Sequence, residues 1–509
     1  MWMERKEPYL FLSLVIIHLL VLFRYEWYPT LDGPAHLYNA ILIKQLVLGN
    51  DFLARYLEFS SFPEPNWSGH AIMAFLSLFL PANWVEKGLV LIVFTTTAYG
   101  FRALVNAHSA RNSIAALLIF PFLCTFTLRI GFFNFSLSIG ILLWLLAWYT
   151  RNRNSISDRS NILLFLFFGL LYFSHALTAV VGIGVIWSWK AQGIVGTRTF
   201  DRYTIKQHAA PLIASLPWLA LIVLFIYRTH GRSETMVLSA DRLLEIAGDG
   251  VPFTIHYGQA MMWAARAIGA TLVILAIIIL VYRLRSDRTI HRSDTWLLIA
   301  LVSLAAYWWL PDSTATGGTI SVRYLLFFYL FLAIWTAVQR WPAVANLFLL
   351  PYLLADLFLV RVDHSFTAEL SDDVQALRSV IGYVEPNSVA LPIIHSQNWF
   401  HGNFSTYLGT GEGVLMLDNY EAMAAHFPLR WKDGHRPPPA DHATFYDSPA
   451  PCVQIEELQR SMQLHIDHVL RWKYDPFMTD SCVQDIDRQL KEGFQLVHGN
   501  GEVQFYGRR

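Results

Sequence analysis

The feature that most constrains this chain is a series of long apolar runs separated by short polar loops. Most of the runs approach the roughly 20 apolar residues that a helix needs to cross the hydrocarbon layer of a membrane. The eleven runs are 9–23, 84–104, 113–127, 132–149, 161–174, 176–189, 208–227, 263–282, 295–310, 323–338 and 343–360. The sequence therefore predicts an α-helical polytopic membrane protein with about eleven transmembrane helices.

The composition agrees with this class and excludes others. Hydrophobic residues make up 54% of the chain and charged residues only 15%, whereas a soluble domain carries about 25% charged residues. Because the net charge is zero, no nucleic-acid partner is implied. The amino terminus has the basic start and apolar centre of a signal peptide without a small-residue cleavage site, so it is interpreted as a retained signal anchor.

Lysine and arginine residues in the short loops predict the orientation of the chain in the membrane. They gather in alternate loops. The first holds Arg102 and Arg111, the second Arg151, Arg153 and Arg159, the third Lys190, Arg198, Arg202 and Lys206, the fourth Arg283, Arg285, Arg288 and Arg292, and the last Arg340. This alternation favours two separate helices that meet at His175 over the alternative of one long helix. It predicts a multi-pass plasma (inner) membrane protein with a cytoplasmic amino terminus and an extracytoplasmic carboxy-terminal domain.

The chain is expected to divide after the last apolar run. Residues 1–360 would form the membrane domain, with a large first outer loop at 24–83. Residues 361–509 are charged and rich in proline, glycine and asparagine, and their patterns predict a small extracytoplasmic α/β domain, with an amphipathic helix at 371–384 and short strands at 387–394 and 501–507. In that tail, Cys452 and Cys482 are either bridged or two unrelated buried cysteines.

The first outer loop holds a candidate catalytic residue. In "LDGPAHLYNAI", Asp32 precedes a Gly-Pro pair and lies four residues before His36. A carboxylate in this place can serve as a general base, but Asp is also common as a helix cap or turn residue before Gly-Pro. Glu64 and His70 follow in the same loop, where a solvated interfacial loop is the simpler interpretation.

Further polar residues fall near the predicted outer ends of later helices. Arg129 and Asn134 lie in a very short turn, His175 lies at a helix junction, and Arg323 lies at a helix entry. An arginine at bilayer depth costs about 2.5 to 3.5 kcal/mol unless it is paired or hydrated. Arginines there suit a lipid phosphate, although each can equally extend from a helix end to the interface, and His175 can be a packing residue. Together with Asp32, these residues predict a cation-bearing outer chamber.

Three stretches resemble the GT-C superfamily of polyprenyl-phosphate-dependent glycosyltransferases, which includes protein O-mannosyltransferases and the bacterial lipid A aminoarabinose transferase. They are "LDGPAHLYNAI", "FPEPNWSGHAIMAFLSLFLPANWVEKGLVLIVF" and "GGTISVRYLLFFYL". The family often has Asp-Glu at the first-loop site, where this chain has Asp32 and Gly33. A second carboxylate would come from elsewhere, such as Glu64, so a divalent metal is left open as a cofactor and no other cofactor is expected.

The resemblance implies an integral membrane glycosyltransferase. It would move a sugar, with inversion, from a polyprenyl-phosphate donor to a lipid, glycan or protein acceptor on the outer face, in contact with membrane lipids. Asp32 would be the base, Arg129 and Arg323 would hold the phosphate, and His36, His70, His175, Asn134 and Glu64 would line the site. Two alternatives remain, a transporter or flippase of lipid-linked saccharides and a non-catalytic envelope assembly protein. A transporter should show internal repeats, and none stands out here.

Overall fold

The computed structural model describes all residues except 1, 109, 153–157, 198–201, 230–234, 288, 290, 315–316, 425, 438–451, 476, 478 and 500. The chain forms two compact units. Unit 1 comprises Met1–Phe23 and Val90–Ser365, and unit 2 comprises Arg24–Leu89 and Phe366–Arg509. The sequence suggested one division at residue 360, whereas the structure groups the first outer loop with the tail.

Each apolar run that the sequence predicts is helical in the structure. The helices that contain these runs are α1 (Trp2–Arg24), α5 (Ala82–His108), the 3-10 segment η1 (Ala110–Phe122), α6 (Phe126–Arg129), α7 (Phe133–Asn152), α8 (Asp158–Ser174), α9 (Ala176–Thr197), α10 (Arg202–Thr229), α12 (Gln259–Ser286), α13 (Thr295–Trp309), α14 (Ile320–Val338) and α15 (Asn346–Arg378). Among the described residues, seven helices are long and apolar enough to cross a membrane: α1, α5, α7, α10, α12, α14 and α15. The predicted class, a helical polytopic membrane protein, is confirmed, and the total of about eleven spans stays a prediction.

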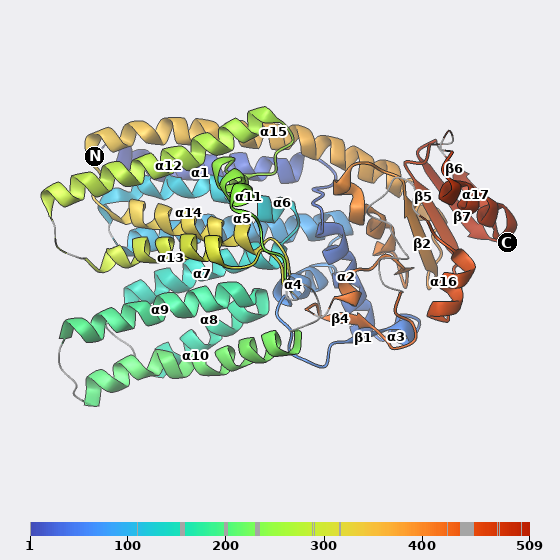
Figure 1. The fold of residues 1–509 in the computed structure, drawn as a ribbon, viewed down its shortest axis with the longest axis horizontal. Coiled ribbons are helices and arrows are strands. Elements are labelled where there is room, and N and C mark those ends of the chain that lie inside the picture. Colours follow the sequence, from blue (N-terminus) through green and yellow to red (C-terminus); the bar gives the residue numbers. More distant parts are fainter. Residues whose placement is uncertain are drawn as a thin grey trace. The chain divides into compact units, whose positions relative to one another are not determined.

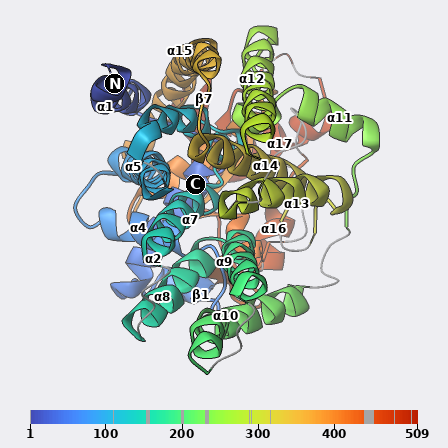
Figure 2. The ribbon, with the colours of Figure 1, turned by 90° about the vertical axis from the view of Figure 1, so that its left-hand side faces the viewer.

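Unit 1 is a bundle of these helices. Figures 1 and 2 show α7 to α10 and α12 to α14 running side by side. Shorter elements connect them, namely α11 (Ala240–Gly248), η2 (Val251–Phe253), η3 (Arg292–Asp294) and η4 (Ala343–Ala345). The predicted break at His175 is confirmed, because α8 ends at Ser174 and α9 begins at Ala176. The two helices fold back on each other, since a Cβ added at Gly182 would lie 2.9 Å from Cδ1 of Leu171.

Unit 2 combines the first outer loop with a small α/β domain. Its elements are α2 (Gly33–Val47), α3 (Leu53–Tyr56), β1 (Leu57–Phe59), α4 (Ser68–Leu76), η5 (Ile381–Tyr383), β2 (Val389–Ile394), η6 (Trp399–Thr410), β3 (Leu415–Met416), η7 (Glu421–Met423), β4 (Leu429–Trp431), α16 (Ile455–Met462), β5 (His468–Trp472), α17 (Ser481–Gly493), β6 (Phe494–Gly499) and β7 (Val503–Arg508). The two predicted strands correspond to β2 and β7. The amphipathic helix predicted at 371–384 is the carboxy-terminal continuation of α15 as far as Arg378.

The sheet of unit 2 is mixed and has five strands in the order β3-β2-β5-β7-β6. Strand β2 pairs in parallel with β3 and β5, while β7 pairs antiparallel with β5 and β6. All residues of β2 and β5 are buried, as expected for central parallel strands that are covered on both faces. Figure 1 shows α17 beside β6 and β7.

The first outer loop is built into the core of this domain, which explains why unit 2 joins distant parts of the chain. Strand β1 pairs antiparallel with β4, with Leu57 opposite Trp431. The hydroxyl of Tyr38 on α2 donates to the Val414 carbonyl and accepts from the Met416 amide, both at 2.9 Å. The close approach requires glycine at position 409, because a Cβ there would lie 2.5 Å from the Tyr38 ring.

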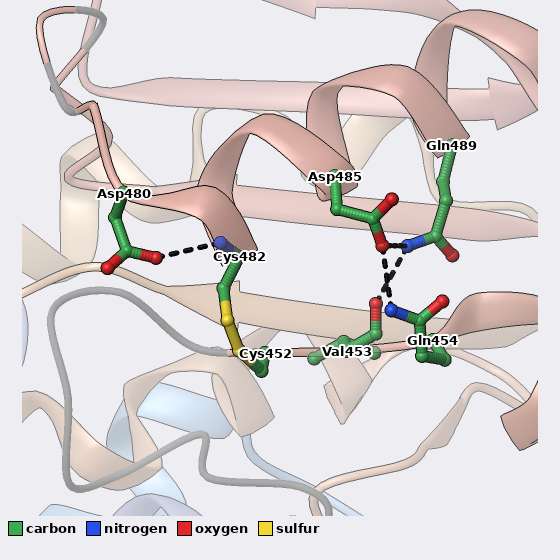
Figure 3. Close-up of a disulfide and its surroundings, with 7 residues drawn as sticks. All are labelled: Cys452, Val453, Gln454, Asp480, Cys482, Asp485 and Gln489. Carbon is green, nitrogen blue, oxygen red and sulfur yellow. Dashed lines mark hydrogen bonds between the residues drawn. A yellow bond between two sulfur atoms is a disulfide. The ribbon is translucent and has the colours of Figure 1, made fainter.

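A disulfide joins Cys452 to Cys482 within the α/β domain, as one of the two interpretations of the sequence predicted (Figure 3). Their Cα atoms are 4.8 Å apart, within the usual range for a disulfide. Cys482 lies in the first turn of α17, where Asp480 Oδ1 accepts a hydrogen bond from the Cys482 amide at 2.8 Å. The bridge therefore ties the start of this helix to the segment before α16.

We expect thiol labelling of the unreduced, denatured chain to modify Cys124 alone, since Cys452 and Cys482 are bridged. The bridged residues are separated by 30 positions, so loop-closure entropy predicts that Cys482→Ser lowers stability by about 3 to 4 kcal/mol. The thermal unfolding midpoint in detergent measures that loss, with Cys124→Ser as the control. Three reactive thiols without reductant would contradict the bridge.

Candidate functional site

Asp32 directly precedes α2, yet its carboxylate does not cap that helix. The Asp32 backbone carbonyl accepts the first helical hydrogen bond, from the His36 amide at 3.0 Å. Its side chain makes no capping bond. The side chain of Thr30 caps the helix instead, because its Oγ1 accepts a hydrogen bond from the Gly33 amide at 3.0 Å. A helix-capping role therefore does not explain why position 32 has a carboxylate side chain.

The Asp32 carboxylate is oriented by a residue of the tail. Nδ2 of Asn403, in η6, donates to Asp32 Oδ1 at 3.0 Å and to the Leu31 carbonyl at 3.1 Å. Asn403 is buried, whereas Asp32 is partly exposed. One buried amide thus holds the carboxylate while part of the Asp32 side chain stays accessible.

The surroundings of Asp32 bring the pKa of its carboxyl group closer to neutral pH. Burial raises the pKa of Asp32 to about 6, the charge of His36 opposes this rise, and the carboxylate of Glu421 adds to it. A general base works best when its pKa lies near the operating pH. Asp32 is therefore ionised at neutral pH, yet binds a proton far more readily than an ordinary aspartate.

His36 and His70 meet at a carboxylate that the sequence analysis did not single out. Nδ1 of His36 lies 2.6 Å from Oε1 of Glu421, and Nε2 of His70 lies 2.8 Å from Oε2. The two imidazole rings meet edge to face, with centroids 5.1 Å apart. Burial acts to raise the pKa of Glu421, but the two histidines outweigh it and lower the pKa to about 2.

Glu64 has a different environment. It is buried, and its Oε1 accepts a hydrogen bond from the Ser60 hydroxyl at 3.2 Å. The carboxylate that contacts both predicted histidines is that of Glu421. Glu64 as a second acidic group of the site stays a prediction.

Glu421 reaches the histidines because α2 and the tail are joined by buried amide pairs. Asn39 and Asn419 exchange two side-chain hydrogen bonds, of 2.9 and 3.0 Å. Asn39 lies one turn after Ala35 and also donates to its carbonyl, at 2.9 Å. These contacts fix the start of η7, and with it Glu421, beside the first turns of α2.

In unit 1, Arg129 and Asn134 are buried on either side of a short turn between two helices. Arg129 ends α6 and is 1% exposed, and Asn134 lies in the first turn of α7 and is 5% exposed. Gly131 allows the tight turn between these helices with a φ of +87°. The Arg129 Nε atom forms an ion pair of 3.1 Å with Asp363 of α15. A carboxylate of the chain itself therefore already balances the charge of Arg129.

Arg323 and His175, which the sequence predicted separately, are in contact in unit 1. Nη1 of Arg323 lies 3.1 Å from Nε2 of His175, which accepts the hydrogen bond. The guanidinium also lies over the ring of Phe132, 4.4 Å from its centroid. Among the described residues no carboxylate lies within ion-pair distance of Arg323. Gly317 lies next to this group, since a Cβ at Gly317 would be 4.0 Å from both terminal guanidinium nitrogens of Arg323.

Sequence reasoning missed Glu421 and Asn403 as site residues. The stretch that contains Glu421, "LDNYEAMAAHFPLRW", is compact and aromatic, and this composition favours a place in the core over an acceptor-binding surface. Leu417 and Trp431 do belong to the core of unit 2. The available signal was the carboxylate of Glu421 directly before the apolar segment "AMAA", because a buried carboxylate needs polar partners.

Comparisons with known proteins give a distant structural match. No protein-family model matches the sequence, and no curated protein matches it. Among solved structures, the chain is similar to the crystal structure of ArnT from Cupriavidus metallidurans in the apo state, with 12% sequence identity and a TM-score of 0.43. The similarity covers 97% of each chain. Because this likeness is distant, the functional argument depends on the residues of the site.

Proposed function

We propose that the chain is an integral membrane glycosyltransferase that moves a sugar from a polyprenyl-phosphate donor to a lipid, glycan or protein acceptor. The observation that carries this proposal is the Asp32 carboxylate. Asp32 is a partly exposed residue; its carboxylate is held by Asn403 and does not cap the helix, and its pKa is raised to about 6. These are the properties of a general base rather than those of a turn residue.

In the proposed step, the acceptor hydroxyl oxygen attacks the anomeric carbon of the donor sugar. The bond from that carbon to the phosphate oxygen breaks, and the polyprenyl phosphate leaves with the electron pair. Asp32 takes the proton of the acceptor hydroxyl as the new bond forms. Attack opposite the leaving phosphate inverts the anomeric centre, as the resemblance to the GT-C superfamily implies.

Of the two arginines predicted to bind the donor phosphate, Arg323 is the stronger candidate. Its Nη1 donates a hydrogen bond to a ring nitrogen of His175, no carboxylate of the described residues lies within ion-pair distance of it, and Gly317 lies next to it. Arg129 is already neutralised by Asp363. Because arginine matches the geometry of phosphate oxygens, we assign phosphate binding to Arg323 and a structural role to Arg129.

The transfer reaction can be tested without knowledge of the acceptor. The purified full chain is incubated with lipids extracted from cells that lack it and with membranes of the same cells. Mass spectrometry should then detect sugar-free polyprenyl phosphate that forms when the chain and the membranes are both present, and not with the extracted lipids alone. A flippase or an assembly protein would leave the donor lipids intact, and that result would contradict the proposal.

The rate of transfer should fall as pH falls through about 6. The folded-state pKa of Asp32 is raised to about 6, so the ionised base is lost below that pH, whereas an ordinary aspartate stays ionised to about pH 4. The measurement is kcat/KM against pH, with donor-lipid binding followed over the same range as the control. A rate that stays level between about pH 7 and pH 5 would exclude Asp32 as the base.

We further propose a cytoplasmic amino terminus and an extracytoplasmic carboxy terminus in the plasma (inner) membrane, from the alternation of basic loops. Reporter fusions after positions 153, 288 and 509 test this orientation; Arg153 and Arg288 lie outside the described residues. The first two reporters should be active only in the cytoplasm and the last only outside. A reporter at 288 on the outer side would overturn the topology and the location of the site on the extracytoplasmic side.

A further inference from the structure

Three buried side chains from three segments of unit 2 converge on one point. They are His36 on α2, His70 on α4 and Glu421 on η7, with exposures of 4%, 0% and 1%. One ligand atom from each lies within 4.8 Å of the others. The set offers two imidazole nitrogens and one carboxylate, which are common ligands of transition metals.

The hydrogen bonds of His70 require either a second proton or a cation. Its Nδ1 lies 3.0 Å from the Asn66 carbonyl, and its Nε2 lies 2.8 Å from Glu421 Oε2. Both neighbours are acceptors, and a neutral imidazole carries only one N–H. If Nδ1–H donates to Asn66, the lone pair of Nε2 points at a carboxylate. A positively charged group is needed between them.

The chain positions the Asn66 carbonyl for this contact. Asn66 has a φ of +69°, a left-handed conformation that costs free energy for a residue other than glycine and is often found at functional sites. Its side chain donates to the His426 carbonyl at 3.2 Å. Histidines that bind metals usually donate their other N–H to a backbone carbonyl or a carboxylate, which fixes the ring and its tautomer. His70 has this arrangement.

The cluster also has an apolar cover. The ring of Phe427 packs against both imidazoles, with centroid separations of 5.7 Å to His36 and to His70. A buried pair of protonated histidine and glutamate would carry a desolvation penalty of several kcal/mol for each ion. A metal ion would satisfy all three groups at once without a separate proton for His70.

We propose that His36, His70 and Glu421 bind a divalent transition-metal ion, with Zn²⁺ the best match. Two histidines and one carboxylate leave a coordination position open for water or another ligand, whereas Mg²⁺ and Ca²⁺ prefer sites made of oxygen ligands. Zinc bonds of about 2.0 to 2.2 Å place tetrahedral ligands about 3.3 Å apart. The present contacts of the Glu421 carboxylate with the two rings, 2.6 and 2.8 Å, are shorter than this separation, so the carboxylate would move away from the rings when the ion enters.

This site does not depend on the proposed transfer reaction, and metal binding tests it directly. The full chain is purified in detergent, stripped with EDTA and titrated with Zn²⁺, and bound metal is counted by mass spectrometry after gel filtration. We expect one ion per chain. His70→Gln and Glu421→Gln each remove a ligand, and should weaken binding by more than the roughly 100-fold that loss of an outer-shell partner causes.

The matched control is His498→Gln, which changes a partly exposed histidine on β6 of the same unit and should bind Zn²⁺ as the unaltered chain does. Failure of the unaltered chain to retain Zn²⁺ would show that a proton joins His70 to Glu421 and would overturn the proposal. Unchanged binding in His70→Gln and Glu421→Gln would overturn it as well. If either variant unfolds, the visible spectrum of the Co²⁺-loaded unaltered chain decides. Bands of a four- or five-coordinate nitrogen and oxygen site support the proposal, and a spectrum of hexaaqua Co²⁺ contradicts it.

Discussion

Asp32→Asn is expected to slow sugar transfer by about 100- to 10,000-fold, the loss that follows removal of a general base. Asparagine keeps the size of the side chain but cannot take the acceptor proton. Because Thr30 and not Asp32 caps α2, the helix should start as before and the amount of protein in the membrane should stay normal. The measurement is kcat for release of sugar-free polyprenyl phosphate.

The matched control is Asp51→Asn, which changes an exposed aspartate of the same loop and should leave the rate unaltered. Donor-lipid binding should also be close to normal in Asp32→Asn, since the deficit lies in proton transfer. An Asp32→Asn chain that inserts normally and keeps full activity would remove Asp32 from the mechanism.

Arg129→Met is expected to give the largest loss of stability, about 3 to 5 kcal/mol, because removal of one partner leaves the other charge buried and uncompensated. Asp363 pairs with Arg129 at 3.1 Å, and their side chains are only 6% and 1% exposed. The measurement is the unfolding free energy in mixed detergent micelles. The double change Arg129→Met with Asp363→Leu should recover part of the loss, since no lone charge then remains.

An exposed ion pair in the same unit provides the comparison. Arg242 and Glu245 are each 54% exposed, so Arg242→Met should change stability by less than about 1 kcal/mol. If Arg129→Met is as mild as Arg242→Met, the buried pair is not structural. If that variant is stable but loses donor binding, Arg129 and not Arg323 holds the phosphate.

The helical part of the fold could be predicted because membrane insertion depends on local hydrophobicity. The apolar runs correspond to helices, with the run 113–127 divided between η1 and α6, and the single-residue break at His175 followed from the alternation of basic loops. The union of the first outer loop with the tail could not be predicted. It depends on contacts such as Tyr38 with Val414 and Leu57 with Trp431, which join residues far apart in sequence and leave no periodic pattern.

The candidate site, too, could be predicted from the sequence only in part. Asp32, His36 and His70 could be named from residue type and position, but residue type does not show whether the side chain of Asp32 or that of Thr30 caps α2. Glu421 comes from 351 residues beyond His70. Their spacing in the sequence does not predict that they are in contact, because only the folded α/β domain brings η7 next to α4. Arg323 and His175 are likewise 148 residues apart and meet only in the bundle.

The central claim, that this chain transfers a sugar, is tested most directly by the lipid and glycan profile of cells that lack it. Mass spectrometry of these cells should show an envelope lipid, glycan or protein that is lighter by one sugar residue, and the unaltered chain supplied in trans should restore the heavier form whereas Asp32→Asn should not. A profile identical to that of the parent cells, or full restoration by Asp32→Asn, would contradict the account.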